Sequence, residues 1–323
     1  MSSFDSVAHQ QGPLVHSMSS AKFQGSICAL VTPFTASGEL DLPAFRRLLA
    51  WHAACGTQAL VIGGSTGESV ALEDAEFEQL VGVAAAEAAG VRIIAGCGAG
   101  STRKSLRMVR RAAALGAEAA LVVTPYYVRP TQEGLVRHYL SLADDGGLPL
   151  VPYNVPTRTG CDLQPETLAR IARHERIVAI KEARAEPERM QALLPLRSDR
   201  FAVLSGDDPT ALRAMRAGAD GVISVANNVV PRAFRALCDA ALSGKGDAAA
   251  AIDAELAPLY AFLGAEPNPI PVKWLVHALG RIGPALRLPL LELSAAHRGE
   301  ADRCLALAGR VERARGEPAT SAA

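Results

Sequence analysis

The stretch IVAIKEA, residues 177–183, has the composition of a buried β-strand, yet it carries a lysine near its end. A short apolar run of this length, rich in β-branched residues, is typical of a strand inside a parallel sheet. Only five of the 33 basic residues in the chain are lysines. Since arginine supplies positive charge almost everywhere else, Lys181 suggests a task that arginine cannot perform.

Similar apolar runs recur along the chain, and each is followed by a loop and a stretch with helical periodicity, as in 73–89 and 208–217. The runs begin near residues 27, 58, 91, 119, 149, 177, 201 and 221. Continuous apolar strands that alternate with helices indicate an α/β fold with a parallel sheet buried on both faces. Eight such units in about 220 residues predict a (β/α)₈ TIM barrel.

The same pattern divides the chain into three parts. Residues 1–22 are predicted to form a disordered tail, and Met18 is a candidate alternative start. The barrel is predicted to span 23–245, and residues 246–323 are predicted to form a C-terminal helical domain because only helical periodicity remains there.

Composition excludes several classes of protein. The formal net charge is zero, which argues against a nucleic-acid partner. No apolar run is long enough to span a membrane, and the N-terminus lacks the apolar segment of a secretory signal. The six cysteines and seven histidines are scattered without metal-binding spacing. We therefore expect a cytoplasmic enzyme that holds no metal and acts on small molecules.

Polar and reactive residues follow the predicted strands, where barrel enzymes place their chemistry. Besides Lys181, the segments are GGSTGES (63–69), TPYY (124–127), YNVPTRTG (153–160), SGDD (205–208) and SVANN (224–228). If these strand ends meet at one rim, hydroxyls, tyrosines, an arginine and one lysine converge there.

These residue types suggest imine chemistry. A desolvated Lys181 amine would have a lowered pKa and could attack a carbonyl, which arginine cannot do. Tyr153 and Tyr127 could move the proton that such a step requires. Ser65 and Thr66, with nearby backbone N–H groups, could bind an anion, and Arg158 could bind a second carboxylate.

Each of these residues also has a structural interpretation. Lys181 could extend to water or pair with Glu182, the tyrosines could pack their rings at the barrel mouth, and Arg158 could be an ordinary surface arginine. The residues alone leave the reaction open between an aldolase, a dehydratase and a decarboxylase acting on a small keto acid.

Eight segments resemble, in order, landmarks of the dihydrodipicolinate synthase/N-acetylneuraminate lyase family. They are FQGSICALVTPF, GGSTGES, TPYYVRPTQEGL, YNVPTRTGCDLQPET, AIKEA, LSGDD, GVISVANN and EPNPIPVKW. The resemblance runs from about Phe23 to the C-terminal helices and is greatest to the synthase branch. It implies condensation of pyruvate with aspartate semialdehyde toward diaminopimelate and lysine, without a cofactor, in a homotetramer built as a dimer of dimers.

The resemblance also implies a role for each matching residue. Lys181 matches the Schiff-base lysine, and Tyr153 matches the tyrosine that moves protons at the imine. Ser65 and Tyr127 match its relay partners, and Tyr127 would reach into the neighbouring subunit's site. The substrate-binding matches are Thr66 for the pyruvate carboxylate, Arg158 for the aldehyde substrate's carboxylate, and Gly206 and Ile223 for the pocket lining.

Two departures from the synthase pattern bear on function. Ser65 stands where threonine is usual, and GGSTGE is closer to the lyase, so another pyruvate-dependent aldolase or lyase, such as a neuraminate lyase or a sugar-acid aldolase, is the main alternative.

The second departure concerns the site at which lysine inhibits members of the family. Ser69 and Tyr126 match residues of that site. Two histidines, an asparagine and a glutamate are replaced there by Asp74, Phe77, Gly100 and Lys104. Weak or absent inhibition by lysine is therefore expected.

More distant alternatives come from other classes. A non-catalytic barrel retained for binding would tolerate loss of Lys181 or Tyr153, yet all the catalytic residue types are present. A phosphate-sugar isomerase is suggested only by GADGVIS, residues 218–224, which is a common way to enter a strand.

Overall fold

The computed structural model of the protein describes residues 22–316. The predicted tail therefore lies outside the described residues except for Lys22, as do residues 317–323 of the predicted C-terminal domain. The proposed boundaries between tail, barrel and C-terminal domain stay predictions.

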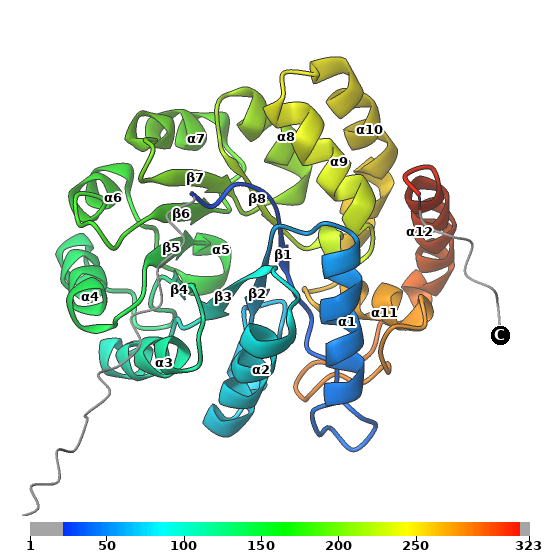
Figure 1. The fold of residues 1–323 in the computed structure, drawn as a ribbon, viewed down its shortest axis with the longest axis horizontal. Coiled ribbons are helices and arrows are strands. Elements are labelled where there is room, and N and C mark those ends of the chain that lie inside the picture. Colours follow the sequence, from blue (N-terminus) through cyan, green and yellow to red (C-terminus); the bar gives the residue numbers. More distant parts are fainter. Residues whose placement is uncertain (1–21, 317–323) are drawn as a thin grey trace, which may run out of the picture.

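Eight parallel strands close into a barrel in the order in which they occur in the chain (Figure 1). They are β1 (Gly25–Ala29), β2 (Ala59–Ile62), β3 (Arg92–Gly96), β4 (Ala119–Val123), β5 (Leu150–Asn154), β6 (Ala179–Glu182), β7 (Ala202–Ser205) and β8 (Gly221–Ser224). Pairing of β1 with β8 closes the ring, with Ile27 opposite Ile223. The predicted TIM barrel is confirmed, and each strand begins within two residues of its predicted start.

The helices surround the barrel in Figure 1. Those that follow the strands are α1 (Leu42–Ala54), α2 (Asp74–Glu87), α3 (Thr102–Ala114), α4 (Gln132–Asp145), α5 (Pro156–Thr159), α6 (Pro165–Ile171), α7 (Pro187–Leu193), α8 (Asp208–Arg216) and α9 (Pro231–Leu242). Three more follow in the C-terminal region: α10 (Gly246–Leu263), α11 (Ile270–Ala278) and α12 (Ala295–Arg313). Helix α10 packs on α8 and α9, so this region lies against one side of the barrel.

Helix α2 shows how local sequence sets these boundaries. Glu73 caps its N-terminus in a reciprocal arrangement with Glu76, so the cap is one residue before Asp74. At the other end Ala89 and Gly90 both have positive φ, which stops the helix. The helix consequently ends two residues earlier than the periodicity of 73–89 suggests.

Two apolar layers separate the inside of the barrel from its outside. Ala179 lies in the inner layer with Tyr153 and Ile223, whereas Ile180 lies in the outer layer against the helices. Because side chains alternate along a strand, Lys181 points into the barrel and Glu182 points out. The strand thus separates the lysine from the neighbouring carboxylate.

Within residues 22–316, none of the helices combines the length and apolar character needed to cross a membrane.

Candidate active site

Tyr153 and Lys181 form the centre of the candidate site. They are directly opposite each other in the β5–β6 pairing, at the carboxyl ends of the two strands. The Lys181 Nζ atom lies 4.2 Å from the centroid of the Tyr153 ring. Both side chains are buried, with 5% and 7% of their surfaces exposed. The structure therefore places the predicted nucleophile beside the predicted proton carrier.

Burial changes the protonation equilibrium of the Lys181 amine. Loss of hydration lowers the pKa of Lys181 to about 8, and the positive charge of Arg158 acts in the same direction, whereas Asp208 opposes them. At pH 7 roughly a tenth of the amine is then neutral, far more than for an ordinary lysine. A neutral amine is the form that attacks a carbonyl, so the environment suits imine formation.

The Tyr153 phenol stays protonated at neutral pH. Burial raises the pKa of Tyr153 to about 12, with Glu182 and Asp207 adding to the rise and Arg158 opposing it. A protonated phenol beside an amine can donate a proton to the oxygen that must leave as water. Tyr153 is thus suited to the acid step of carbinolamine breakdown.

The GGSTGES segment forms a tight loop after β2 that carries Ser65 and Thr66. Its first residue, Gly63, has a φ of +65°, and a Cβ there would lie 3.0 Å from the Phe77 ring. Gly67 is tied to the segment after β1, because its carbonyl accepts a hydrogen bond from the Thr32 hydroxyl at 2.8 Å. The loop buries Thr66 and leaves Ser65 half-buried.

Asn268, in the loop before α11, connects two of the predicted substrate-binding residues. Its Nδ2 donates to the Thr66 hydroxyl at 3.0 Å, and its backbone carbonyl accepts from Arg158 Nη2 at 3.2 Å. The Asn268 Oδ1 atom is buried and has no hydrogen-bond partner among residues 22–316. No role was predicted for Asn268 from the sequence. Its segment was noted only as the EPNPIPVKW landmark of the family resemblance.

Gly206 and Ile223 complete the surroundings of the lysine. Ile223 is fully buried in the inner layer of the barrel. Gly206 follows β7, and its backbone N–H donates to the Glu182 carbonyl at 2.7 Å. A Cβ on Gly206 would lie 2.9 Å from Cε and 3.0 Å from Cγ of Lys181, closer than side chains normally approach. The absence of a side chain at Gly206 is what makes room for the lysine.

Substitution of Gly206 by alanine should therefore displace the amine without unfolding the barrel. We expect imine formation with pyruvate, the substrate that the resemblance implies, to slow by roughly 10²-fold, the scale of a 1 Å misplacement in an active site. The measurement is the rate of borohydride trapping. Gly299→Ala is the matched control, because a Cβ there meets nothing within 4 Å. Wild-type trapping by Gly206→Ala would contradict the packing argument.

Tyr127 does not join this cluster within one chain. It lies in the loop after β4 with a φ of +73°, and 92% of its surface is exposed. Its backbone N–H donates to the Thr159 carbonyl at 3.3 Å, which ties the loop to α5. The predicted role of Tyr127 depends on a second subunit and stays a prediction, as do the roles of the other seven site residues.

Known proteins resemble the chain over nearly its whole length. A model of the dihydrodipicolinate synthetase family matches residues 22–308. The 4-hydroxy-tetrahydrodipicolinate synthase of Xanthomonas axonopodis pv. citri (strain 306) is 59% identical over 283 residues, which cover 87% of this chain and 93% of that protein. The enzyme of the same name from Stenotrophomonas maltophilia (strain K279a) is 54% identical over 279 residues, covering 86% and 94%.

A solved structure shows the same likeness in three dimensions. The dihydrodipicolinate synthase of Acinetobacter baumannii, crystallised in complex with pyruvate, superposes with a TM-score of 0.87 at 42% identity, covering 88% of this chain and 99% of that one. Sequence and fold therefore agree, and the chain belongs to the dihydrodipicolinate synthetase family of enzymes.

Proposed function

We propose that the protein condenses pyruvate with L-aspartate 4-semialdehyde to give 4-hydroxy-tetrahydrodipicolinate, in the route to diaminopimelate and lysine. The observation that carries the proposal is the buried Lys181 amine beside the Tyr153 ring, with a pKa lowered to about 8. The names of the relatives support the choice of reaction within imine chemistry.

The first half of the reaction uses Lys181, Tyr153 and the loop after β2. The neutral Lys181 amine attacks the ketone carbon of pyruvate, and a proton passes from its nitrogen to the former carbonyl oxygen. A second proton from Tyr153 lets that oxygen leave as water. Thr66 holds the pyruvate carboxylate. The resulting imine makes the methyl carbon acidic, and loss of one of its protons gives an enamine, which is the carbon nucleophile. No metal or other cofactor enters these steps.

The second half joins the enamine to the aldehyde. The enamine carbon attacks the aldehyde carbon of the semialdehyde and forms the new carbon–carbon bond, and the aldehyde oxygen becomes a hydroxyl. Arg158 pairs with the carboxylate of this substrate. The unpartnered Asn268 Oδ1 is a suitable acceptor for its ammonium group. Once this ammonium has lost a proton, the amine attacks the imine carbon and closes the ring. The Lys181 nitrogen takes up a proton and leaves as the free amine.

Turnover with both substrates tests the proposal directly. Purified protein should consume pyruvate and aspartate semialdehyde, and a coupled reductase should report the product. If the protein traps pyruvate but does not use the semialdehyde, the imine half stands and the second substrate is another aldehyde. That result would favour the sugar-acid aldolase or neuraminate lyase alternative suggested by Ser65.

Arg158→Ala should separate the two halves of the reaction. Loss of a charge-assisted hydrogen bond costs about 1.5–3 kcal/mol, so kcat/KM for the semialdehyde should fall roughly ten- to a hundredfold while pyruvate is still trapped on Lys181. Arg158→Lys keeps the charge but loses the two-point contact, and should lie in between. Equal losses for pyruvate trapping and for semialdehyde use would contradict this assignment.

Weak or absent inhibition by lysine is the expected regulatory behaviour. Phe77 is buried against the loop after β2 instead of offering a polar ligand. Lys104 is exposed on α3, where its charge would repel a cationic amino acid. Turnover should continue at lysine concentrations that saturate sensitive synthases, and Lys104→Glu should increase sensitivity. An inhibition constant in the micromolar range for the wild type would contradict this prediction.

Assembly into a dimer of dimers is part of the same proposal. Val70, Tyr127 and Val128 are apolar or aromatic side chains with 80%, 92% and 57% of their surfaces exposed. Val70 lies in a short 3₁₀ helix, η1 (Ser69–Ala71), that follows β2, and Tyr127 and Val128 lie in the loop after β4, next to the candidate site. Exposed apolar groups at one rim support a subunit contact there, and a partner covering Tyr127 would bring its hydroxyl into use.

A further inference from the structure

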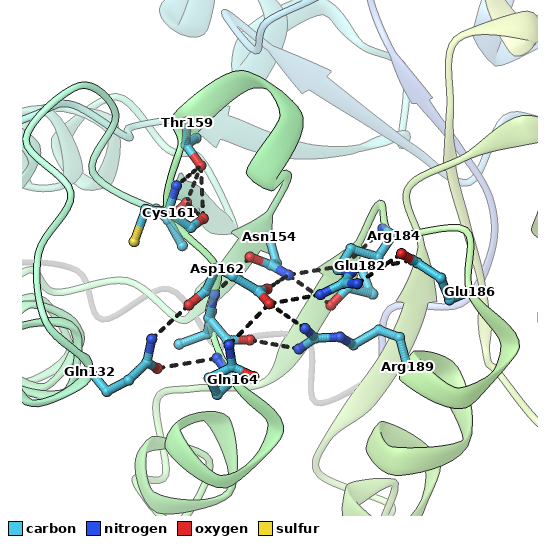
Figure 2. A network of polar contacts seen from close by, with 12 residues as sticks. Gln132, Asn154, Thr159, Cys161, Asp162, Gln164, Glu182, Arg184, Glu186 and Arg189 are labelled. Atoms are coloured by element: carbon cyan, nitrogen blue, oxygen red, sulfur yellow. Dashed lines mark hydrogen bonds and ion pairs between the residues drawn. The ribbon is translucent and has the colours of Figure 1, made fainter.

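A polar cluster lies on the outer side of the barrel wall, directly behind Tyr153 and Lys181. Its centre consists of Asn154, Asp162 and Glu182, which we call the strand clamp (Figure 2). Asn154 and Glu182 are the next residues along β5 and β6 and form the next pair in the register. Since side chains alternate along a strand, the clamp and the reactive pair occupy opposite faces of the same two strand ends.

The clamp is joined by hydrogen bonds of normal length. Asn154 Nδ2 donates to the two Glu182 carboxylate oxygens at 3.1 and 3.0 Å and to Asp162 Oδ1 at 2.8 Å. Asn154 Oδ1 accepts from the Leu163 N–H at 2.9 Å, and Glu182 Oε1 accepts from the Arg184 N–H at 2.8 Å. The Asn154 side chain on β5 thus links the Glu182 side chain on β6 to Asp162.

The charges of the cluster are unevenly distributed. Asp162 Oδ2 pairs with Arg184 Nη1 at 2.9 Å and with Arg189 Nη2. Glu182, with 1% of its surface exposed, receives hydrogen bonds from an amide side chain and a backbone N–H and pairs with neither guanidinium. Burial therefore raises the pKa of Glu182 to about 7. A buried carboxylate retained here without a cation of its own needs an explanation beyond stability.

We propose that Glu182 is a positioning residue for the Tyr153–Lys181 pair, acting from behind the barrel wall by holding the ends of β5 and β6 together. The inference rests on the imine chemistry proposed above. The register between β5 and β6 pairs Tyr153 with Lys181 and Asn154 with Glu182, and the Ala183 N–H adds a backbone hydrogen bond to the Asn154 carbonyl at 3.0 Å. The clamp adds side-chain links to these backbone links at the strand ends, and so helps to fix the distance between the amine and the phenol.

The Glu182 carboxylate also acts on Tyr153 through space. Its negative charge adds to the effect of burial and of Asp207 in raising the pKa of Tyr153, whereas Arg158 opposes it. On the outer face of the strands, the Asp162 charge raises the pKa of Glu182 and the Arg189 charge lowers it. Removal of the Glu182 charge should therefore lower the pKa of Tyr153. The alkaline limb of the pH–rate profile should then move to lower pH.

Glu182→Gln tests the inference because it keeps the shape and removes the charge. In that variant an NH₂ group replaces one of the two oxygens that accept from Asn154, so the clamp is weakened. Pyruvate trapping by borohydride should be slower by roughly ten- to a hundredfold, with unchanged circular dichroism and the shifted alkaline limb. Glu186→Gln is the matched control, since Glu186 pairs with Arg184 but is exposed and outside the clamp. It should behave like the wild type.

Trapping at the wild-type rate with an unshifted alkaline limb would overturn the inference. If Glu182→Gln does not fold, Asn154→Ser provides the test. This substitution removes the side-chain amide that donates to Glu182 and leaves the Glu182 carboxylate in place. Slower trapping by a folded Asn154→Ser supports the positioning role, and wild-type trapping refutes it. If the wild-type protein itself traps no pyruvate, the proposed function is refuted. Failure of the proposed function can thus be distinguished from failure of the positioning role, which concerns only the variants.

Discussion

Lys181→Ala should abolish catalysis while leaving the fold intact. The expected loss in kcat is on the order of 10⁶-fold, the scale seen when other covalent enzymes lose their nucleophile. The amine makes no ion pair among the described residues, and it lies over an aromatic ring instead. Its removal deletes the reacting group without breaking an ion pair or a side-chain hydrogen bond of the described residues. Turnover in the coupled assay and a thermal unfolding curve are the measurements.

Lys181→Arg is the informative companion to that variant. Arginine keeps a positive charge but cannot form an imine, so Lys181→Arg should be as inactive as Lys181→Ala. The control Lys245→Ala, at an exposed lysine, should have wild-type activity. Substantial activity in Lys181→Arg, or misfolding of Lys181→Ala, would favour a structural role for this lysine.

Lys273→Met should have the largest effect on stability. Lys273 and Glu68 are buried, with 0% and 1% of their side chains exposed, and their charged groups are 2.5 Å apart. The ammonium also donates to the Ala285 carbonyl at 2.7 Å. Removal of the lysine leaves the Glu68 charge buried without its cation, which typically costs about 3–5 kcal/mol. Urea unfolding of the variant and of Lys245→Met, at an exposed site, measures the difference.

A second substitution tests the cause of that loss. In the Lys273→Met background, Glu68→Gln removes the uncompensated charge and should recover part of the free energy of unfolding. Glu68 belongs to the loop that carries Ser65 and Thr66, so Lys273→Met should also weaken pyruvate binding. A Lys273→Met protein as stable as Lys245→Met would show that the ion pair does not hold this loop to the C-terminal region.

The barrel was predictable from the sequence because its signals are local. Each strand is a short apolar run, and the alternation of runs with helical stretches defines the eight units. The placement of polar and reactive residue types at the strand ends followed from the same reasoning, since the carboxyl ends of barrel strands meet at one rim. The pairing of Tyr153 with Lys181 in the structure is a consequence of that topology.

Contacts between distant parts of the chain were not predictable in this way. Lys273 is as buried as Lys181 yet serves as the partner of Glu68, which lies 205 positions away in the sequence. The Asn268–Thr66 hydrogen bond spans 202 positions. The scarcity of lysine applies to Lys273 as much as to Lys181, and only their surroundings distinguish the ion-paired residue from the one proposed to form the imine. Glu182 was considered as a partner of Lys181, but it points to the other face of β6.

The most direct test of the central claim is mass spectrometry of the protein after borohydride reduction in the presence of pyruvate. One reduced pyruvate per chain is expected, attached to the peptide that contains Lys181. An adduct on another lysine, or no adduct while the protein still turns over both substrates, would contradict an imine mechanism centred on Lys181.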